Sequence, residues 1–233
     1  MKLTNKILLV FLILLVLLVT TYKIIFNGKV ELIPNAIDKN ADYIYRKISF
    51  AEKPINTLEL NGRFIVNLIK SDTLFVVIHG PDNLVNNYMG LEQNGSRMSI
   101  SSKIDLSKYY HPITIDFRTN KLDAVFLSGG TIVSTKKFDG DLLNVTLKDS
   151  AMFDATSSMF NKVNIIGENK STTMISKTKN ATVQLLDESN LLLTLDGGEI
   201  SGTIGAKTDF GLEGDIKKNS VIRVKERKNG REK

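Results

Sequence analysis

The second half of this 233-residue chain is built from one repeating pattern. Each repeat opens with alternating apolar residues, and a second apolar group follows about half a repeat later. The repeats begin at Leu122, Leu143, Val163, Ala181 and Ile200, so that successive starts lie 21, 20, 18 and 19 residues apart. Two short strands per repeat, joined by polar turns, are typical of a β-solenoid in which each coil stacks on the one before.

An antiparallel β-sandwich is the main alternative, because it also places a turn every ~8–12 residues. The narrow range of repeat lengths favours the solenoid, since stacked coils need similar perimeters. We therefore predict an all-β domain, a β-solenoid with about 20 residues per coil. It should occupy residues 47–225 and be followed by a basic tail over residues 226–233.

An uncharged apolar run extends from Ile7 to Tyr22 between two lysines. A run of about 20 residues can cross the hydrocarbon core of a bilayer as a helix. A cleaved signal peptide is the alternative, but the residues after the run are a poor cleavage site. We predict a transmembrane anchor over residues 1–26. Its apolar residues include Ile7, Phe11, Leu14, Leu18 and Tyr22.

The polar residues 27–46 are predicted to form a juxtamembrane linker. Lys2 and Lys6 precede the apolar run, and this bias weakly favours an N-terminus inside the cell. The domain is then expected on the extracytoplasmic side of the membrane, in the periplasm or at the cell surface.

Charge and composition exclude several classes of function. Residues 217–233 hold eight basic and two acidic side chains, six net positive charges, and the whole chain also carries +6. The body of the domain is therefore neutral, which argues against a nucleic-acid partner. The chain has no Cys, and His79 and His111 are too few for a polyhistidine metal site. We predict no cofactor and no metal. His79 sits at a strand end before Gly80-Pro81, and we interpret it as a turn residue and not as a catalytic base.

Several segments carry a resemblance to a known family. They are Ile55–Leu60 with Asn61-Gly62, Phe75–Leu84, Glu92–Ile100, Ile113–Phe117, and Leu122–Leu127 with Ser128-Gly129-Gly130. They resemble the auto-transporter adhesin head GIN domain family of Bacteroidetes envelope proteins. The resemblance implies a right-handed parallel β-helix, here placed after an N-terminal transmembrane helix. Later repeats replace the family's turn glycines, as in Asp149-Ser150, which puts the tightness of those turns in question.

Two groups of residues are candidates for a binding site. Tyr109, Tyr110 and His111 form an aromatic loop before a proline, and Asp139 and Asp141 flank a glycine at a coil turn. Stacked coils could bring such acids together, as the general acid–base chemistry of glycosidic bonds requires. Acids at turns are more often simply solvated, and fold alone carries no function.

We therefore predict no enzyme. The expected role is non-catalytic, either adhesin-like binding or scaffolding. The partner would be the membrane, through the N-terminal helix, and a protein or glycan on the solenoid face. The alternative is a carbohydrate-active enzyme, a polysaccharide lyase or hydrolase on the same fold.

Overall fold

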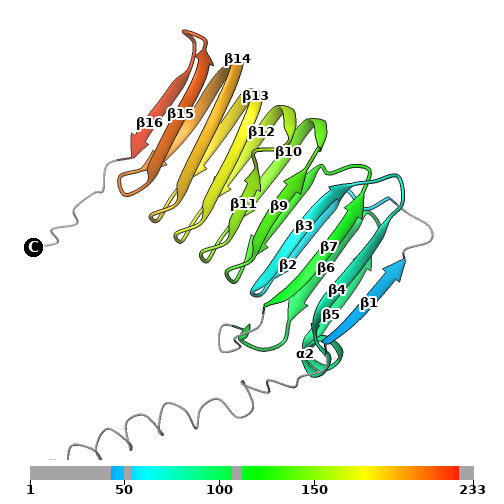
Figure 1. The fold of residues 1–233 in the computed structure, drawn as a ribbon. Coiled ribbons are helices and arrows are strands. Elements are labelled where there is room, and N and C mark those ends of the chain that lie inside the picture. The colour runs from blue at the N-terminus through cyan, green and yellow to red at the C-terminus, as the bar shows by residue number, and fades with distance from the viewer. Residues whose placement is uncertain (1–42, 50–53, 107–111, 226–233) are drawn as a thin grey trace, which may run out of the picture. The chain divides into compact units, whose positions relative to one another are not determined.

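The computed structural model describes residues 43–49, 54–106 and 112–225, which belong to one compact unit. Their regular structure is a long series of β-strands with one α-helix (Figure 1). The elements of the first half are β1 (Tyr43–Ser49), β2 (Thr57–Asn61), β3 (Phe64–Lys70), β4 (Phe75–Pro81), α2 (Asp82–Tyr88), β5 (Met89–Asn94), β6 (Arg97–Ser102) and β7 (Ile113–Thr119). Those of the second half are β8 (Ala124–Ser128), β9 (Ile132–Lys136), β10 (Asp139–Leu147), β11 (Met152–Ala155), β12 (Met159–Gly167), β13 (Thr172–Leu185), β14 (Asn190–Gly205), β15 (Asp209–Ile216) and β16 (Val221–Lys225).

The sequence repeat becomes two ladders of parallel strands. Ladder A contains β2, β8, β10, β12, the second halves of β13 and β14, and β16. Ladder B contains β3, β9, β11, the first halves of β13 and β14, and β15. Equivalent residues of successive repeats lie side by side, as Leu143, Val163, Ala181 and Ile200 do in ladder A. Figure 1 shows these strands in sequence order, from β2 and β3 in cyan through green and yellow to β16 in red.

The all-β class is confirmed, but the predicted right-handed parallel β-helix is wrong. The strands belong to one mixed sheet whose path runs from β1 to β5 without closing. Antiparallel pairs join β1 to β4, β4 to β7 and β5 to β6. The physical reason is visible at Gly95-Ser96, a two-residue loop between β5 and β6. Such a short loop can join only antiparallel strands, because a parallel pair needs a long crossover.

The transmembrane helix that formed part of the same prediction falls on residues 1–26, outside the described residues. Within residues 43–49, 54–106 and 112–225, no helix has the length and apolar character that a membrane crossing requires. The predicted anchor residues Ile7, Phe11, Leu14, Leu18 and Tyr22 lie outside the described residues. The same is true of nearly all of the predicted linker and of the tail.

Alternating side chains form the core between the ladders. In β7 every second residue is buried, from Ile113 through Ile115 and Phe117 to Thr119. Because neighbouring strands are in register, buried residues of one repeat contact those of the next. Full burial of one such aliphatic or aromatic side chain contributes about 1.5–3 kcal/mol. The repeat is therefore held together by its inward rows, and the outward rows are free to vary.

The turns from ladder A to ladder B are tight even where glycine is missing. Gly129 and Gly130 have φ of 69° and 76°, and Asp149 and Ser150 have 54° and 61° at the equivalent positions. Two consecutive residues with positive φ define the type I′ turn. The turns stack through the backbone, since the Gly130 N–H donates to the Asp149 carbonyl over 3.0 Å. The turn geometry therefore persists after the glycines are lost.

Candidate binding surfaces

The structure brings Asp139 and Asp141 to one open pocket of about 420 Å³. Asp139 Oδ2 lies 3.5 Å from Lys70 Nζ, and Asp141 Oδ1 accepts a hydrogen bond from Asn161 Nδ2 over 2.8 Å. Lys177, Lys179 and Asp196 also line the pocket. Each carboxylate is therefore engaged by a partner in a surface of mixed charge. Across the part of the chain that the structure describes, no three acidic or histidine side chains cluster as metal ligands.

The other predicted binding residues cannot be placed. Tyr109, Tyr110 and His111 lie outside the described residues, which end at Leu106 and resume at Pro112. Their role in binding stays a prediction.

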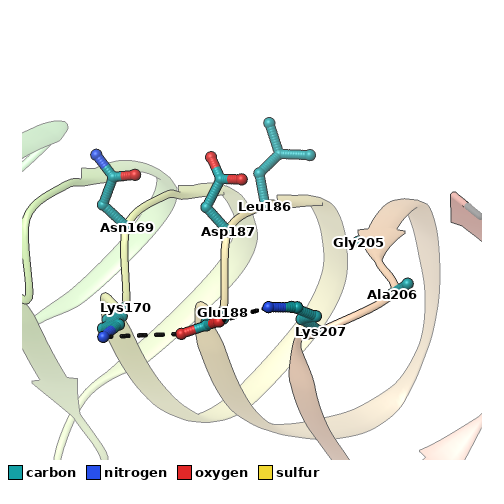
Figure 2. Close-up of a pocket in the computed structure, with 8 residues that line it drawn as sticks. All are labelled: Asn169, Lys170, Leu186, Asp187, Glu188, Gly205, Ala206 and Lys207. Carbon is teal, nitrogen blue, oxygen red and sulfur yellow. Dashed lines mark hydrogen bonds and ion pairs between the residues drawn. The ribbon is translucent and has the colours of Figure 1, made fainter. Parts of the chain in front are cut away.

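A second pocket, of about 560 Å³, lies over the turns of the later repeats. Figure 2 shows Lys170, Glu188 and Lys207 in a row, whereas Asp187 points away from them. The Glu188 carboxylate lies 3.0 Å from Lys207 Nζ and 3.8 Å from Lys170 Nζ. The hydrogen bond from Lys207 and the charges of both lysines hold the pKa of Glu188 below its ordinary value. A similar pair joins Lys148 to Glu168 over 3.0 Å.

This row of charges was not identified from the sequence. Its signal is the recurrence of Lys or Glu at the turn of each repeat, and stacking converts that recurrence into ion pairs. Exposed pairs of this kind contribute little stability each. We interpret the row as a solvated edge whose charges are mutually satisfied.

The outward face of ladder A is largely polar, although Ile166, beside Thr146, is 37% exposed. Asn164 Nδ2 donates to Asn144 Oδ1 over 2.8 Å, so that equivalent amides form a small ladder. Arg97 donates to Glu59 over 2.6 Å and also lies over the ring of Phe126. Burial raises the pKa of Glu59, but hydrogen bonds from Ser99 and Arg97 outweigh it and lower the pKa overall.

The outward face of ladder B is apolar by comparison. Ile65, Ile132 and Leu192 expose 38%, 44% and 42% of their surface, which is unusual for large aliphatic side chains. Ile65 pairs with Ile132, and Ile132 pairs with Met152 on the next strand. These residues therefore form one continuous row across β3, β9 and β11. Leu192 on β14 lies in the neighbouring row of the same ladder, where it pairs with Met174.

An aromatic cluster extends this face at β1 and β4. The rings of Tyr45 and His79 are stacked with centroids 4.2 Å apart, and Tyr43 lies 5.2 Å from His79. Tyr45 is 76% exposed. Lys47 Nζ lies 4.5 Å from the centre of the Phe75 ring on the same two strands. His79 lies near the end of β4, as the sequence predicted, but its outward position beside Tyr45 became visible only once β1 was paired with β4.

The comparisons with known proteins agree with an adhesin-like domain. The sequence matches the family described as "Putative auto-transporter adhesin, head GIN domain" over residues 54–226. The chain belongs to this family, as the sequence resemblance predicted. The family description supports an adhesin-like role. No curated protein matches the chain significantly.

One solved structure shows a similar fold at low sequence identity, and others are less similar. A putative adhesin from Parabacteroides distasonis is 13% identical with a TM-score of 0.56, covering 80% of this chain and 95% of its own. A putative adhesin from Parabacteroides merdae is 16% identical with a TM-score of 0.48, covering 81% and 95%. One from Bacteroides fragilis is 14% identical with a TM-score of 0.45, covering 79% and 97%. Only the first of these has a TM-score high enough to support a fold comparison.

Proposed function

We propose that this protein is a non-catalytic, adhesin-like component of the cell envelope that binds a protein partner through the outward face of ladder B. In this proposal the apolar run of residues 7–22 attaches the chain to a membrane, and the domain lies on the extracytoplasmic side. The family description supports an envelope location. The apolar run supplies the attachment.

The row of exposed aliphatic side chains on ladder B carries this proposal. A strand face that needs only solvent contact normally presents polar residues, as ladder A does. Contiguous exposed apolar surface, by contrast, marks interaction sites. Three large aliphatic side chains on this face take no part in core packing. They belong to Ile65, Ile132 and Leu192.

The side-chain types favour a protein over a glycan. Aliphatic and Met side chains fit the apolar centre of protein interfaces, where charged residues are depleted. Recognition of sugars relies instead on polar groups and aromatic platforms. The aromatic cluster at Tyr45 and His79 fits a protein or a glycan. The aliphatic row at Ile132 fits only a protein.

The alternative enzyme has little support from the site. General acid–base catalysis needs a carboxylate free to exchange a proton with a bound substrate. Asp139 and Asp141 are paired instead with Lys70 and Asn161. A panel of polysaccharides incubated with the wild type and with an Asp139→Asn, Asp141→Asn double variant would test this. Turnover by the wild type that the variant loses would overturn the non-catalytic proposal.

The binding face can be tested by site-specific photo-crosslinking of the full-length chain in its native host. A photoreactive residue at Ile132 is expected to capture a discrete protein, whereas one at Thr146 on the outward face of ladder A is not. The captured protein is then purified and its direct binding measured. Leu192→Asp should abolish binding, and Thr146→Asp should not. Equal capture from both faces, or capture of a species sensitive to glycosidases, would contradict a protein partner on ladder B.

Location is tested separately by protease accessibility. A C-terminal tag is followed in intact cells, in spheroplasts and in lysate. Digestion before lysis would support an extracytoplasmic domain. Protection until lysis would contradict it.

A further inference from the structure

The stack of repeats has two ends, one near β4 and the other at β15 and β16, and these ends are covered to different extents. At the β4 end, α2 buries Leu84 and Val85, which are 2% and 1% exposed. Val85 packs closely enough against Gly80 that an added Cβ there would lie 3.2 Å from Val85 Cγ2. At the other end, β15 and β16 each pair only with β14 within the described residues. Their outer backbone edges therefore have no strand partner there.

The inward rows of the core are uncovered at this second end. Leu193 is fully buried, but its neighbour Leu212 on β15 is only partly buried. Ile204 is 8% exposed, and its neighbour Val224 on β16 is 65% exposed. Residues 226–233, which follow β16 in the sequence, contain no apolar side chain. An open edge with apolar residues beside it is a template for strand pairing.

The two open edges carry opposite charges. The acidic residues Asp209, Glu213 and Asp215 lie on β15, which has no basic residue. Arg223 and Lys225 lie on β16, which has no acidic residue. Among the described residues, neither Glu213 nor Arg223 has an ion-pair partner within 4.0 Å.

We infer that this end is an interface between two copies of the chain, in which β15 of one copy pairs with β16 of the other. The chain reverses at the turn Lys217–Ser220, and Figure 1 shows β15 and β16 running in opposite directions. A two-fold axis along the strands and midway between the ladders then places β15 of one copy antiparallel to β16 of its partner. Both edges are satisfied at once, as expected of an isologous dimer.

The side chains select this arrangement over the other two-fold pairing. The rival axis would pair β15 with β15 and β16 with β16, which sets acidic edges against acidic ones. Like charges directly opposite each other destabilise a strand pair, whereas opposite charges stabilise it. With Glu213 opposite Arg223, antiparallel pairing also sets Leu212 opposite Val224. The outward salt bridge and the inward apolar contact therefore require the same register.

Charge reversal tests the interface in the full-length chain, purified in detergent and measured by sedimentation velocity. Wild type is expected to be dimeric. Glu213→Lys and Arg223→Glu should each raise the dimer dissociation constant at least roughly tenfold, about 1.4 kcal/mol. The double variant should restore it, because each reversed residue then faces its reversed partner. Lys162→Glu, on β12 away from the end, is the matched control. A monomeric wild type, or a dimer indifferent to these changes, overturns the inference.

Disulfide trapping tests the arrangement itself, and the chain has no cysteine to interfere. Glu213→Cys and Arg223→Cys variants are prepared separately and mixed under mild oxidation. The mixture should form a cross-linked dimer, whereas neither variant should cross-link alone. Circular dichroism verifies that both remain folded. Self-cross-linking of Glu213→Cys would establish the rival pairing and overturn the proposed one.

Discussion

Tyr45 and His79 lie face to face on neighbouring antiparallel strands, with ring centroids 4.2 Å apart and planes inclined by 14°. Tyr45 lies on β1 and His79 on β4, so the stacked rings hold β1 against β4. Both rings lie on the side of the sheet that continues into the outward face of ladder B. The pair therefore contributes both to the docking of an edge strand and to the proposed binding face.

Replacing Tyr45 by alanine is expected to weaken the docking of β1. Aromatic pairs contribute about 0.5–1.5 kcal/mol beyond the area they bury, and an exposed pair should lie at the lower end. Urea denaturation followed by circular dichroism measures the change in the free energy of unfolding. Tyr88→Ala, the substitution of a tyrosine in α2 that is 38% exposed and lies outside the aromatic cluster, serves as a comparison. A Tyr45→Ala variant as stable as wild type would show that β1 docks through its backbone alone.

Two adjacent glycines should respond very differently to alanine. A Cβ on Gly198 would overlap the backbone carbonyl of Lys179, which cannot move without disturbing the ladder. A Cβ on Gly197 meets nothing within 4 Å, although its φ of +70° disfavours a side chain. Gly198→Ala should cost roughly 3 kcal/mol, at the upper end of overpacking penalties. Gly197→Ala should cost about 1 kcal/mol. Similar thermal midpoints for the two variants would contradict the close approach at Gly198.

The turn that lacks glycine should gain stability when glycine is restored. Ser150 adopts φ of 61°, where a side chain is strained by about 1–2 kcal/mol. Ser150→Gly is therefore expected to stabilise the fold by up to ~1 kcal/mol, after the added flexibility of glycine in the unfolded chain is subtracted. The reciprocal change Gly130→Ala, at φ of 76°, should destabilise it. Thermal unfolding of both variants measures the effect, and a loss of stability in Ser150→Gly would refute the type I′ assignment.

Stability should depend on the ionisation of Glu188 in acid. The lysines lower its pKa in the folded state below the ordinary value of 4.5. The stabilisation is therefore present above pH 4.5 and is lost as the pH falls through the folded-state pKa. Glu188→Gln should be slightly less stable than wild type at neutral pH, and the difference should disappear in strong acid and at high salt. Asp187→Asn, on the same turn but pointing away from the lysines, should show no such convergence. A difference independent of pH would contradict the ion-pair row.

The candidate sites could be predicted only in part from the sequence. The sequence placed Asp139 and Asp141 at a coil turn, whereas both lie on β10. The pairing of Asp139 with Lys70, which lies 69 residues earlier, was not predicted. The apolar row on ladder B was also missed. Ile65 and Ile132 each resemble ordinary strand residues, and they become one surface only when β3 pairs with β9.

The sequence by itself determined the repeat, the positions of most of its strands and turns, and the inward alternation of the core. These properties are local, since they depend on which side chains alternate within a few residues. The sequence did not predict β1, which begins within the predicted linker. Only the tertiary structure decided which strands pair and in which direction. The pairing of β1, β4 and β5 depends on which backbone edges remain free after the ladders stack, and a free edge has no signature in a short stretch of sequence. The same long-range pairing decides which outward side chains become neighbours, and therefore which face can bind.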